Sequence, residues 1–484
     1  MKKTIPLFLI LFITSAVHAE ITLPDAISDG MVLQQQTHVT LWGKAEPGNT
    51  IQVATSWLEQ NTTKVDKNGY WKIQIATPKG SYTPQSITFV EISKKHGWME
   101  PAPILIDDVL IGEVWLGGGQ SNMEMVMNGF NNCPIGHANE EIMNAHKFTG
   151  KIRYLTVKQI QTFEPADFAY GKWQETYSTT LPRFGATAYF FAQTIQQALD
   201  VPVGIINCSW GGSRVEGWLP REILKDYPEE VIDREHIYDR HDWWNRPMEM
   251  YNGMLYPLRH YTIRGFIWYQ GCANVDHPEQ YTERLSRMVG EWRRVFNQGE
   301  LPFYFTEIAP FTYDDSADAE KAALLREAQW RLEDVCPHCA GISTNDLVEA
   351  YEIGNIHPKN KKDVGQRLAY LALNDTYMFT QVACHSPRFE KYEIKGNEVY
   401  LYFTNATDGW ERLKDIEGFE IEDANGLHPA NVRVCWDPAN CLILSAKGVD
   451  NPTAANYCFH NARLGNMRNM RGLPIVPFKI KLQK

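Results

Sequence analysis

The feature that most constrains this chain is the hydrophobic pattern of its middle part. Between residues 109 and 374, short apolar stretches alternate with amphipathic ones. An apolar strand followed by an amphipathic helix is typical of the βαβ unit, which needs a parallel sheet covered on both faces. We therefore predict an α/β domain here. Its buried strands are expected at residues 109–116, 203–207, 265–269 and 303–308, and its helices at 187–199, 280–296, 321–335 and 361–373.

The two flanks show a different pattern, in which polar and apolar residues alternate and no convincing helix is found. Residues 39–43 and 50–54 read as strands, and the sequence Pro47-Gly48-Asn49 between them reads as a turn. This pattern is typical of strands and hairpins, and it returns from about residue 386. We expect an N-terminal β-sandwich-like domain at 20–107, the α/β domain at 108–380 with an irregular excursion near 220–250, and a C-terminal β domain at 381–484.

The first 19 residues have the pattern of a cleaved signal peptide. Lys2 and Lys3 precede an apolar run over residues 6–17, and Ala19 is the small residue expected at a cleavage site. The run is shorter than the roughly 20 residues that cross a bilayer, and no later stretch is long enough. We therefore expect no membrane span and an exported protein, periplasmic or secreted.

Composition argues against several kinds of partner. The chain has 47 Lys and Arg against 58 Asp and Glu, a net charge of −11. Nucleic-acid surfaces need clustered basic residues that displace counterions, so no nucleic-acid partner is expected. Nine cysteines in an exported chain permit disulfides. A bridge between Cys435 and Cys441, across a turn-like sequence, is one candidate.

A serine follows the first predicted strand of the α/β domain. That strand runs into three glycines and then Gln120-Ser121. Ligands of α/β domains bind at the carboxyl ends of the strands, so Ser121 suits a nucleophile. A hydroxyl needs a neighbouring base, and the candidate is His357, in the loop before the helix at 361–373. The alternatives are that Ser121 only caps a helix, or that Ser209, in a near match to G-x-S-x-G, is the nucleophile.

Four motifs, in this order, resemble those of the sialate O-acetylesterase family of SGNH hydrolases. They are Gly119-Gln120-Ser121-Asn122-Met123, the segment 210–218, Trp268-Tyr269-Gln270-Gly271 and the segment 356–361. The resemblance extends to both flanks and implies an SGNH-type three-layer α/β/α hydrolase core between N- and C-terminal β-sandwich-like domains. It also implies an exported serine esterase that removes O-acetyl groups from sugars, sialate above all, through an acetyl-enzyme and without a metal or other cofactor.

The resemblance also implies a role for each candidate site residue. Ser121 is the nucleophile and His357 the base. The oxyanion donors are the backbone N–H of Ser121, a backbone N–H of the Gly211-Gly212 turn, Gly211 in preference, and the side-chain amide of Asn274. Three further residues, Asn207, Gln120 and Asn122, tether loops or touch the acyl ester. Arg214 pairs with a substrate carboxylate or, alternatively, forms a structural ion pair.

Two departures from the family pattern leave alternatives open. Cys272 and Ala273 stand before Asn274 where many members have Glu-Ser, and Gly354 stands where an Asp usually precedes the catalytic His by three residues. The third triad member is Asp346, Glu349 or Glu352, or the enzyme works as a Ser-His dyad. Two other functions stay open: an acetylxylan or other polysaccharide acetylesterase, and a carbohydrate-binding protein on an inactive esterase core.

Overall fold

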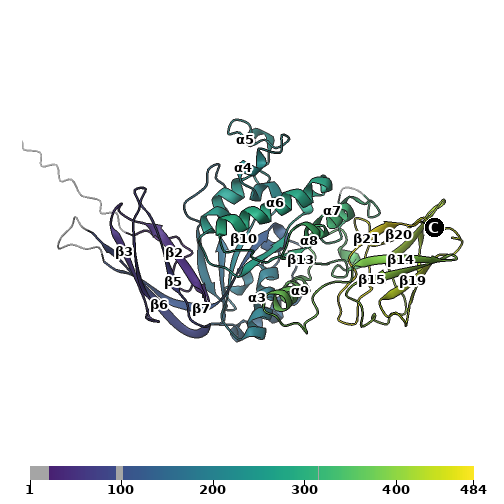
Figure 1. The fold of residues 1–484 in the computed structure, drawn as a ribbon, viewed down its shortest axis with the longest axis horizontal. Helices are drawn as coiled ribbons and strands as arrows, with labels where there is room; N and C mark the ends of the chain where they lie inside the picture. Colours follow the sequence, from purple (N-terminus) through teal and green to yellow (C-terminus); the bar gives the residue numbers. More distant parts are fainter. Residues whose placement is uncertain (1–20, 94–101, 314–315, 484) are drawn as a thin grey trace, which may run out of the picture.

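The computed structural model describes residues 21–93, 102–313 and 316–483. The predicted signal peptide at residues 1–19 lies outside these ranges. Figure 1 shows an elongated molecule in which an N-terminal β region, a central α/β body and a C-terminal β region follow one another. None of the helices in the described ranges combines the length and the apolar character that crossing a bilayer requires.

The central body is built on a parallel sheet with the strand order β13-β12-β11-β7-β10-β8, to which β9 adds an antiparallel edge. Its inner strands β10 and β11 are buried at every position. The prediction of buried parallel strands is therefore confirmed. The strands are β7 (Ile104–Gly119), β8 (Ile152–Val157), β9 (Gly171–Glu175), β10 (Val203–Ser209), β11 (Gly265–Tyr269), β12 (Phe303–Thr306) and β13 (Cys339–Ile342).

Helices cover both faces of this sheet, α6 and α7 above it and α3 and α9 below it in Figure 1. On one face, Trp115 of β7 packs against Phe191 of α3 with ring centroids 5.0 Å apart. On the other, Trp268 of β11 packs against Trp292 of α6 at 5.4 Å. The long helices are α3 (Ala186–Leu199), α6 (Pro278–Phe296), α7 (Lys321–Trp330) and α9 (Lys361–Leu371), and the short ones are α1 (Ser121–Glu124), α2 (Ala138–Met143), α4 (Arg221–Leu224), α5 (Ile237–Arg240) and α8 (Leu332–Val335). The single helix expected at 321–335 is thus divided into α7 and α8.

The N-terminal β region is joined to the central sheet by one continuous strand. The first half of β7 pairs with β6 antiparallel and with β1 parallel, and from Glu113 onward the same strand pairs with β10. The boundary expected between 107 and 108 therefore falls inside a strand and not in a linker. The other strands here are β1 (Val32–Gln34), β2 (His38–Lys44), β3 (Thr50–Thr55), β4 (Gln60–Lys64), β5 (Tyr70–Ala76) and β6 (Ser81–Ile92).

The C-terminal β region consists of two four-stranded sheets, β14-β15-β19-β18 and β17-β16-β20-β21. Both sheets contribute to one hydrophobic core, which includes Leu401 and Ile421. The hairpin expected around residue 438 exists, because Cys435 N–H donates to the Cys441 carbonyl at 3.0 Å. Both thiols are free, so the predicted disulfide is wrong. The strands are β14 (Phe389–Lys395), β15 (Glu398–Phe403), β16 (Phe419–Asp423), β17 (Gly426–Pro429), β18 (Asn431–Val434), β19 (Cys441–Ser445), β20 (Ala454–Tyr457) and β21 (Phe478–Lys481).

Candidate active site

Ser121 lies where the central strand β7 ends. The strand closes with Gly119, whose φ is +136°. A Cβ on this residue would lie 2.2 Å from the Tyr269 carbonyl oxygen, so only glycine allows the chain to turn here. Helix α1 begins two residues later with Ser121. The Ser121 N–H therefore belongs to the first turn of a helix, where N–H groups have no acceptor within the helix.

The structure brings His357 to this serine from 236 positions further along the chain. The imidazole Nε2 lies 2.8 Å from the Ser121 Oγ, within the distance that proton abstraction requires. The ring packs edge-on against Phe130, with centroids 5.3 Å apart. Burial, with the nearby Lys361 amine, lowers the pKa of His357 to about 4. At neutral pH the imidazole is therefore uncharged, which is the form that accepts a proton.

A buried clamp holds the segments of the two residues together. Asn122 donates from Nδ2 to the Ile356 carbonyl at 3.0 Å and accepts at Oδ1 from Lys361 Nζ at 2.8 Å. Lys361 also donates to the Pro358 carbonyl at 2.6 Å. Its side chain is inaccessible to solvent, and burial lowers the pKa of Lys361 to about 7. Asn122 is thus a tether in this structure. Sequence reasoning missed Lys361, although a lysine four residues after the candidate base was visible.

Gln120 forms a second tether. Its side-chain oxygen accepts the N–H of Gly271 at 2.9 Å, and Gln120 is almost fully buried. The bond joins the turn before Ser121 to the segment after β11. Of the two roles expected for Gln120, the described contacts are those of a tether.

One of the donors expected to stabilise an oxyanion, the N–H of Gly211, lies near Ser121 but already has an acceptor. Gly211 lies against the nucleophile, since a Cβ on it would be 3.5 Å from the Ser121 Cβ. Its N–H, however, donates to the carboxylate of Glu124 at 2.5 Å. Glu124 is half-buried and burial raises the pKa of its carboxyl. Sequence reasoning missed this residue, which ends helix α1.

The amide of Asn274 is hydrogen-bonded to a buried carboxylate and to a backbone N–H. Its Nδ2 donates to the two carboxylate oxygens of Glu216 at 3.2 and 3.0 Å, and its Oδ1 accepts the Val215 N–H at 3.0 Å. The two oxygens of one carboxylate lie too close together to take both hydrogens of the amide, so these bonds leave one N–H of Asn274 for another acceptor.

Arg214 lies in a cluster of buried charges. It pairs with Glu230 at 2.9 Å and with Glu216 at 3.7 Å. Arg284 contacts the same two carboxylates. These contacts correspond to the alternative expected for Arg214, a structural ion pair. To bind a substrate carboxylate, Arg214 would have to exchange partners that it already has.

The competing nucleophile Ser209 has a different partner. Its hydroxyl donates to the Asn207 side-chain oxygen at 3.0 Å, and the residue is buried at the end of β10. Ser121, and not Ser209, is therefore the serine that lies against a histidine.

The three acids considered for orienting His357 are engaged elsewhere. Asp346 accepts from Arg367 and from Arg468, each at 2.7 Å. Glu349 and Glu352 cap the short helix η7 (Ala350–Glu352) reciprocally. Within the ranges that the structure describes, no carboxylate is hydrogen-bonded to His357. Its Nδ1 instead faces the thiol of Cys133 at 4.0 Å.

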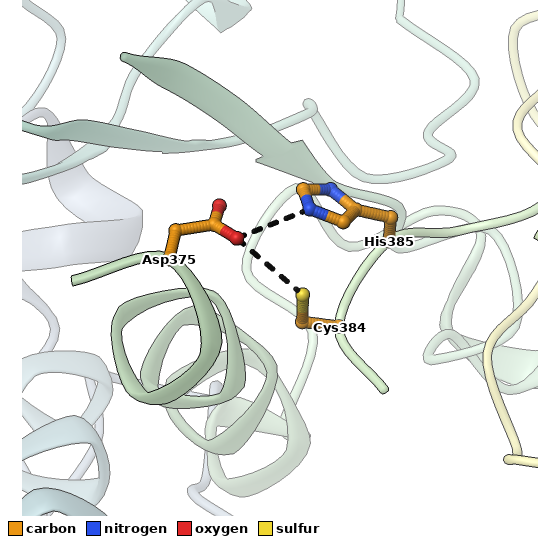
Figure 2. Close-up of side chains that lie close together, drawn as sticks. All are labelled: Asp375, Cys384 and His385. Carbon is orange, nitrogen blue, oxygen red and sulfur yellow. Dashed lines mark hydrogen bonds and ion pairs between the residues drawn. The ribbon is translucent and has the colours of Figure 1, made fainter. Parts of the chain in front are cut away.

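One group of three side chains in the described ranges has donor atoms for a metal ion. Figure 2 shows Asp375, Cys384 and His385, whose donor atoms lie within 4.8 Å of one another. Asp375 and His385 form an ion pair at 3.2 Å, and the hydrogen bond with Asp375 raises the pKa of His385 to about 10. The described contacts of this group are those of an ion pair between Asp375 and His385.

Comparison with known proteins identifies the family. The family model described as carbohydrate esterase, sialic acid-specific acetylesterase, matches residues 111–374. This match covers more than half of the chain and includes both Ser121 and His357. The chain belongs to this family. It is a carboxylic ester hydrolase that acts on O-acetylated sugars, and the resemblance inferred from the motifs is confirmed.

Individual relatives agree with the family. The sialate O-acetylesterases of Mus musculus and Homo sapiens are each 24% identical to this chain. The alignments cover 83% of this chain and 82% of the mouse protein, and 87% of this chain and 83% of the human protein. A solved structure described as a novel carbohydrate acetylesterase from Xanthomonas citri is 27% identical, with a TM-score of 0.81 over 95% of this chain and 99% of that one.

Proposed function

We propose that this family member is an exported serine esterase that removes O-acetyl groups from sugars with Ser121 as nucleophile and His357 as base. The observation that carries the proposal is the 2.8 Å contact between His357 Nε2 and Ser121 Oγ at the carboxyl edge of the sheet. We assign the central body to the SGNH type, with three α/β/α layers between two β-sandwich-like domains. Export rests on the pattern of residues 1–19 alone.

The reaction has two steps. His357 takes the hydroxyl proton of Ser121 while Oγ attacks the acetyl carbonyl carbon. The tetrahedral oxyanion collapses, and the sugar oxygen leaves with the proton that His357 held. Water, deprotonated by the same imidazole, then attacks the acetyl-enzyme and releases acetate. Neither step consumes a cofactor.

We place the oxyanion on the N–H groups of Ser121 and Gly211, because Gly211 lies so near the nucleophile that a Cβ on it would be 3.5 Å from the Ser121 Cβ. Glu124 must release the Gly211 N–H for this role. Asn274 is the third donor, through the amide N–H that Glu216 does not take. Each donor of this kind is worth about 10²–10³ in rate where one has been removed.

For the substrate we propose O-acetylated sialic acid, since the family description and several relatives carry that name. A neutral polysaccharide such as acetylated xylan is the second candidate, because Arg214 is already paired with two carboxylates. A carbohydrate-binding protein on an inactive core is disfavoured by the Ser121–His357 contact, which sugar binding alone does not need.

The test compares the wild type with Ser121→Ala, His357→Ala and, as the matched control, Ser209→Ala. Acetate release is measured from 4-nitrophenyl acetate, an O-acetylated sialic acid and acetylated xylan. We expect the first two variants to lose more than about 10³-fold in kcat on every ester that the wild type cleaves, and Ser209→Ala to retain activity. Activity that survives Ser121→Ala would contradict the site assignment. The ester from which the wild type releases acetate faster, O-acetylated sialic acid or acetylated xylan, decides between the two substrate classes.

A further inference from the structure

The Nδ1 side of the base needs a hydrogen-bond acceptor, and no carboxylate in the described ranges supplies one. For Nε2 to accept a proton from Ser121, the neutral imidazole must carry its own proton on Nδ1. In a Ser-His-Asp triad a carboxylate accepts that N–H, which sets the tautomer and the ring orientation. Here the three candidate acids are occupied elsewhere.

The group at Nδ1 is a thiol. Cys133 Sγ lies 4.0 Å from His357 Nδ1 and 3.3 Å from the side-chain oxygen of Asn355. That oxygen also accepts the backbone N–H of His357 at 2.9 Å. The directions are compatible, since the thiol proton points to Asn355 and leaves the sulfur lone pairs facing Nδ1.

The chain fixes the thiol in this place. Phe130 and Cys133 exchange two backbone hydrogen bonds, 2.9 and 3.0 Å long, which close a tight turn. One end of the turn supplies the Phe130 ring that packs on the imidazole, and the other supplies the thiol. The same turn therefore contacts the base twice.

We propose that Cys133 and Asn355 together take the place of the triad acid, as a neutral relay from Nδ1–H to Sγ–H to Asn355 Oδ1. Both are positioning residues, because they act through His357 and not on the substrate. The inference rests on the proposed function of Ser121 and His357 and adds what keeps the base in its reactive tautomer.

A neutral relay has an electrostatic consequence. The polar groups around the imidazole are the Ser121 hydroxyl, the Cys133 thiol and the amine of Lys361, whose pKa burial lowers to about 7. None of them stabilises an imidazolium as a carboxylate does, which agrees with the lowered pKa of His357. An opposite charge within about 4–6 Å shifts a pKa by about 1–3 units, so a carboxylate at position 133 should move the titration of the base strongly upward.

The first experiment uses three substitutions of Cys133 in the full chain. Cys133→Ala removes the relay and is expected to lower kcat about tenfold with little change in KM. Cys133→Ser keeps a donor and an acceptor and is expected to stay within about threefold of the wild type. Cys133→Asp is expected to move the acid limb of the kcat/KM profile from near pH 4 upward by at least about one unit. Thermal melting of each variant verifies folding.

The second experiment uses the reactivity of the thiol. Cys133 is half-buried and lines a cavity of about 680 Å³ together with His357. Of the other eight cysteines, only Cys435 is partly exposed. Iodoacetamide should therefore inactivate the wild type and the control Cys435→Ala, and leave the residual activity of Cys133→Ala unchanged. Mass spectrometry identifies the alkylated cysteine.

Three results would each overturn the inference: an unchanged kcat in Cys133→Ala, an unmoved acid limb in folded Cys133→Asp, or full activity after Cys133 is alkylated. None of these results contradicts the proposed function, which fails only if Ser121→Ala or His357→Ala stays active. The two failures are therefore distinguishable.

Discussion

At the residue scale, the N–H of Gly211 has two uses that exclude each other. In the structure it donates to the Glu124 carboxylate at 2.5 Å, and in the proposed reaction it donates to the oxyanion. A carboxylate beside the nucleophile also repels the negative charge that develops in the transition state. Glu124 thus opposes the reaction for as long as it stays at Gly211.

Replacing the Glu124 carboxylate tests whether it competes with the oxyanion for the Gly211 N–H. Glu124→Gln keeps the size and removes the charge, so we expect kcat on 4-nitrophenyl acetate to rise, by roughly tenfold. Glu140→Gln, on the exposed helix α2, is the control and should leave kcat unchanged. A higher KM for the sugar ester with no gain in kcat would instead mean that Glu124 leaves Gly211 to bind the substrate.

At the element scale, the active site depends on how the start of α9 meets α1. The serine is in α1, the histidine is in the loop before α9, and the clamp between Asn122 and Lys361 joins them. Because proton transfer depends on a contact of 2.8 Å, a small slip of one helix against the other separates the pair. A misplacement of about 1 Å costs about 10²-fold in rate.

We therefore expect Lys361→Met to lower kcat between roughly tenfold and a hundredfold while KM changes little. Lys362→Met is the matched control. Its amine pairs with Glu141 at 3.1 Å and not with a residue of the clamp, so kcat should stay near the wild-type value. Wild-type kcat in a folded Lys361→Met protein would show that the clamp does not position the base.

At the scale of the whole molecule, Asp346 fastens the C-terminal region to the central body. Its carboxylate follows β13 and accepts from Arg367 of α9 and from Arg468 of the C-terminal region. The Asp346 side chain is only 2% exposed. The acid considered as the third triad member thus holds two regions together.

Asp346→Asn should lower the free energy of unfolding by about 3 kcal/mol, because it leaves buried arginine charge without its partner. Urea denaturation measures this change. Asp408→Asn breaks an exposed pair with Arg471 and should cost less than about 1 kcal/mol. Below its melting temperature, Asp346→Asn should keep the pH profile of the wild type, and a displaced acid limb would contradict this account.

A residue of the site could be predicted from the sequence where a local pattern marks it, and could not where its role depends on a partner far away in the chain. Ser121 and His357, which lie 2.8 Å apart in the structure, could be proposed from the sequence because glycines after a buried strand, and a His in a loop before a helix, are local patterns. Gln120 and Asn122 were found as motif members with two roles open. Lys361, Glu124 and Cys133 were missed, since each matters only through a partner far away in the chain. For Arg214 both a substrate contact and a structural ion pair were expected, and its described contacts are ion pairs.

The amino-acid sequence by itself determined the class of each region, because hydrophobic periods of two and of three to four residues are local and survive without tertiary contacts. It determined the family as well, since ordered motifs carry the resemblance. Only the tertiary structure decided that β7 runs through the expected domain boundary, that Cys435 and Cys441 are unbridged, and that a thiol faces the base. These features depend on which side chains meet across the sheet and its loops, and the direction of a side chain toward a distant partner leaves no trace in local pattern.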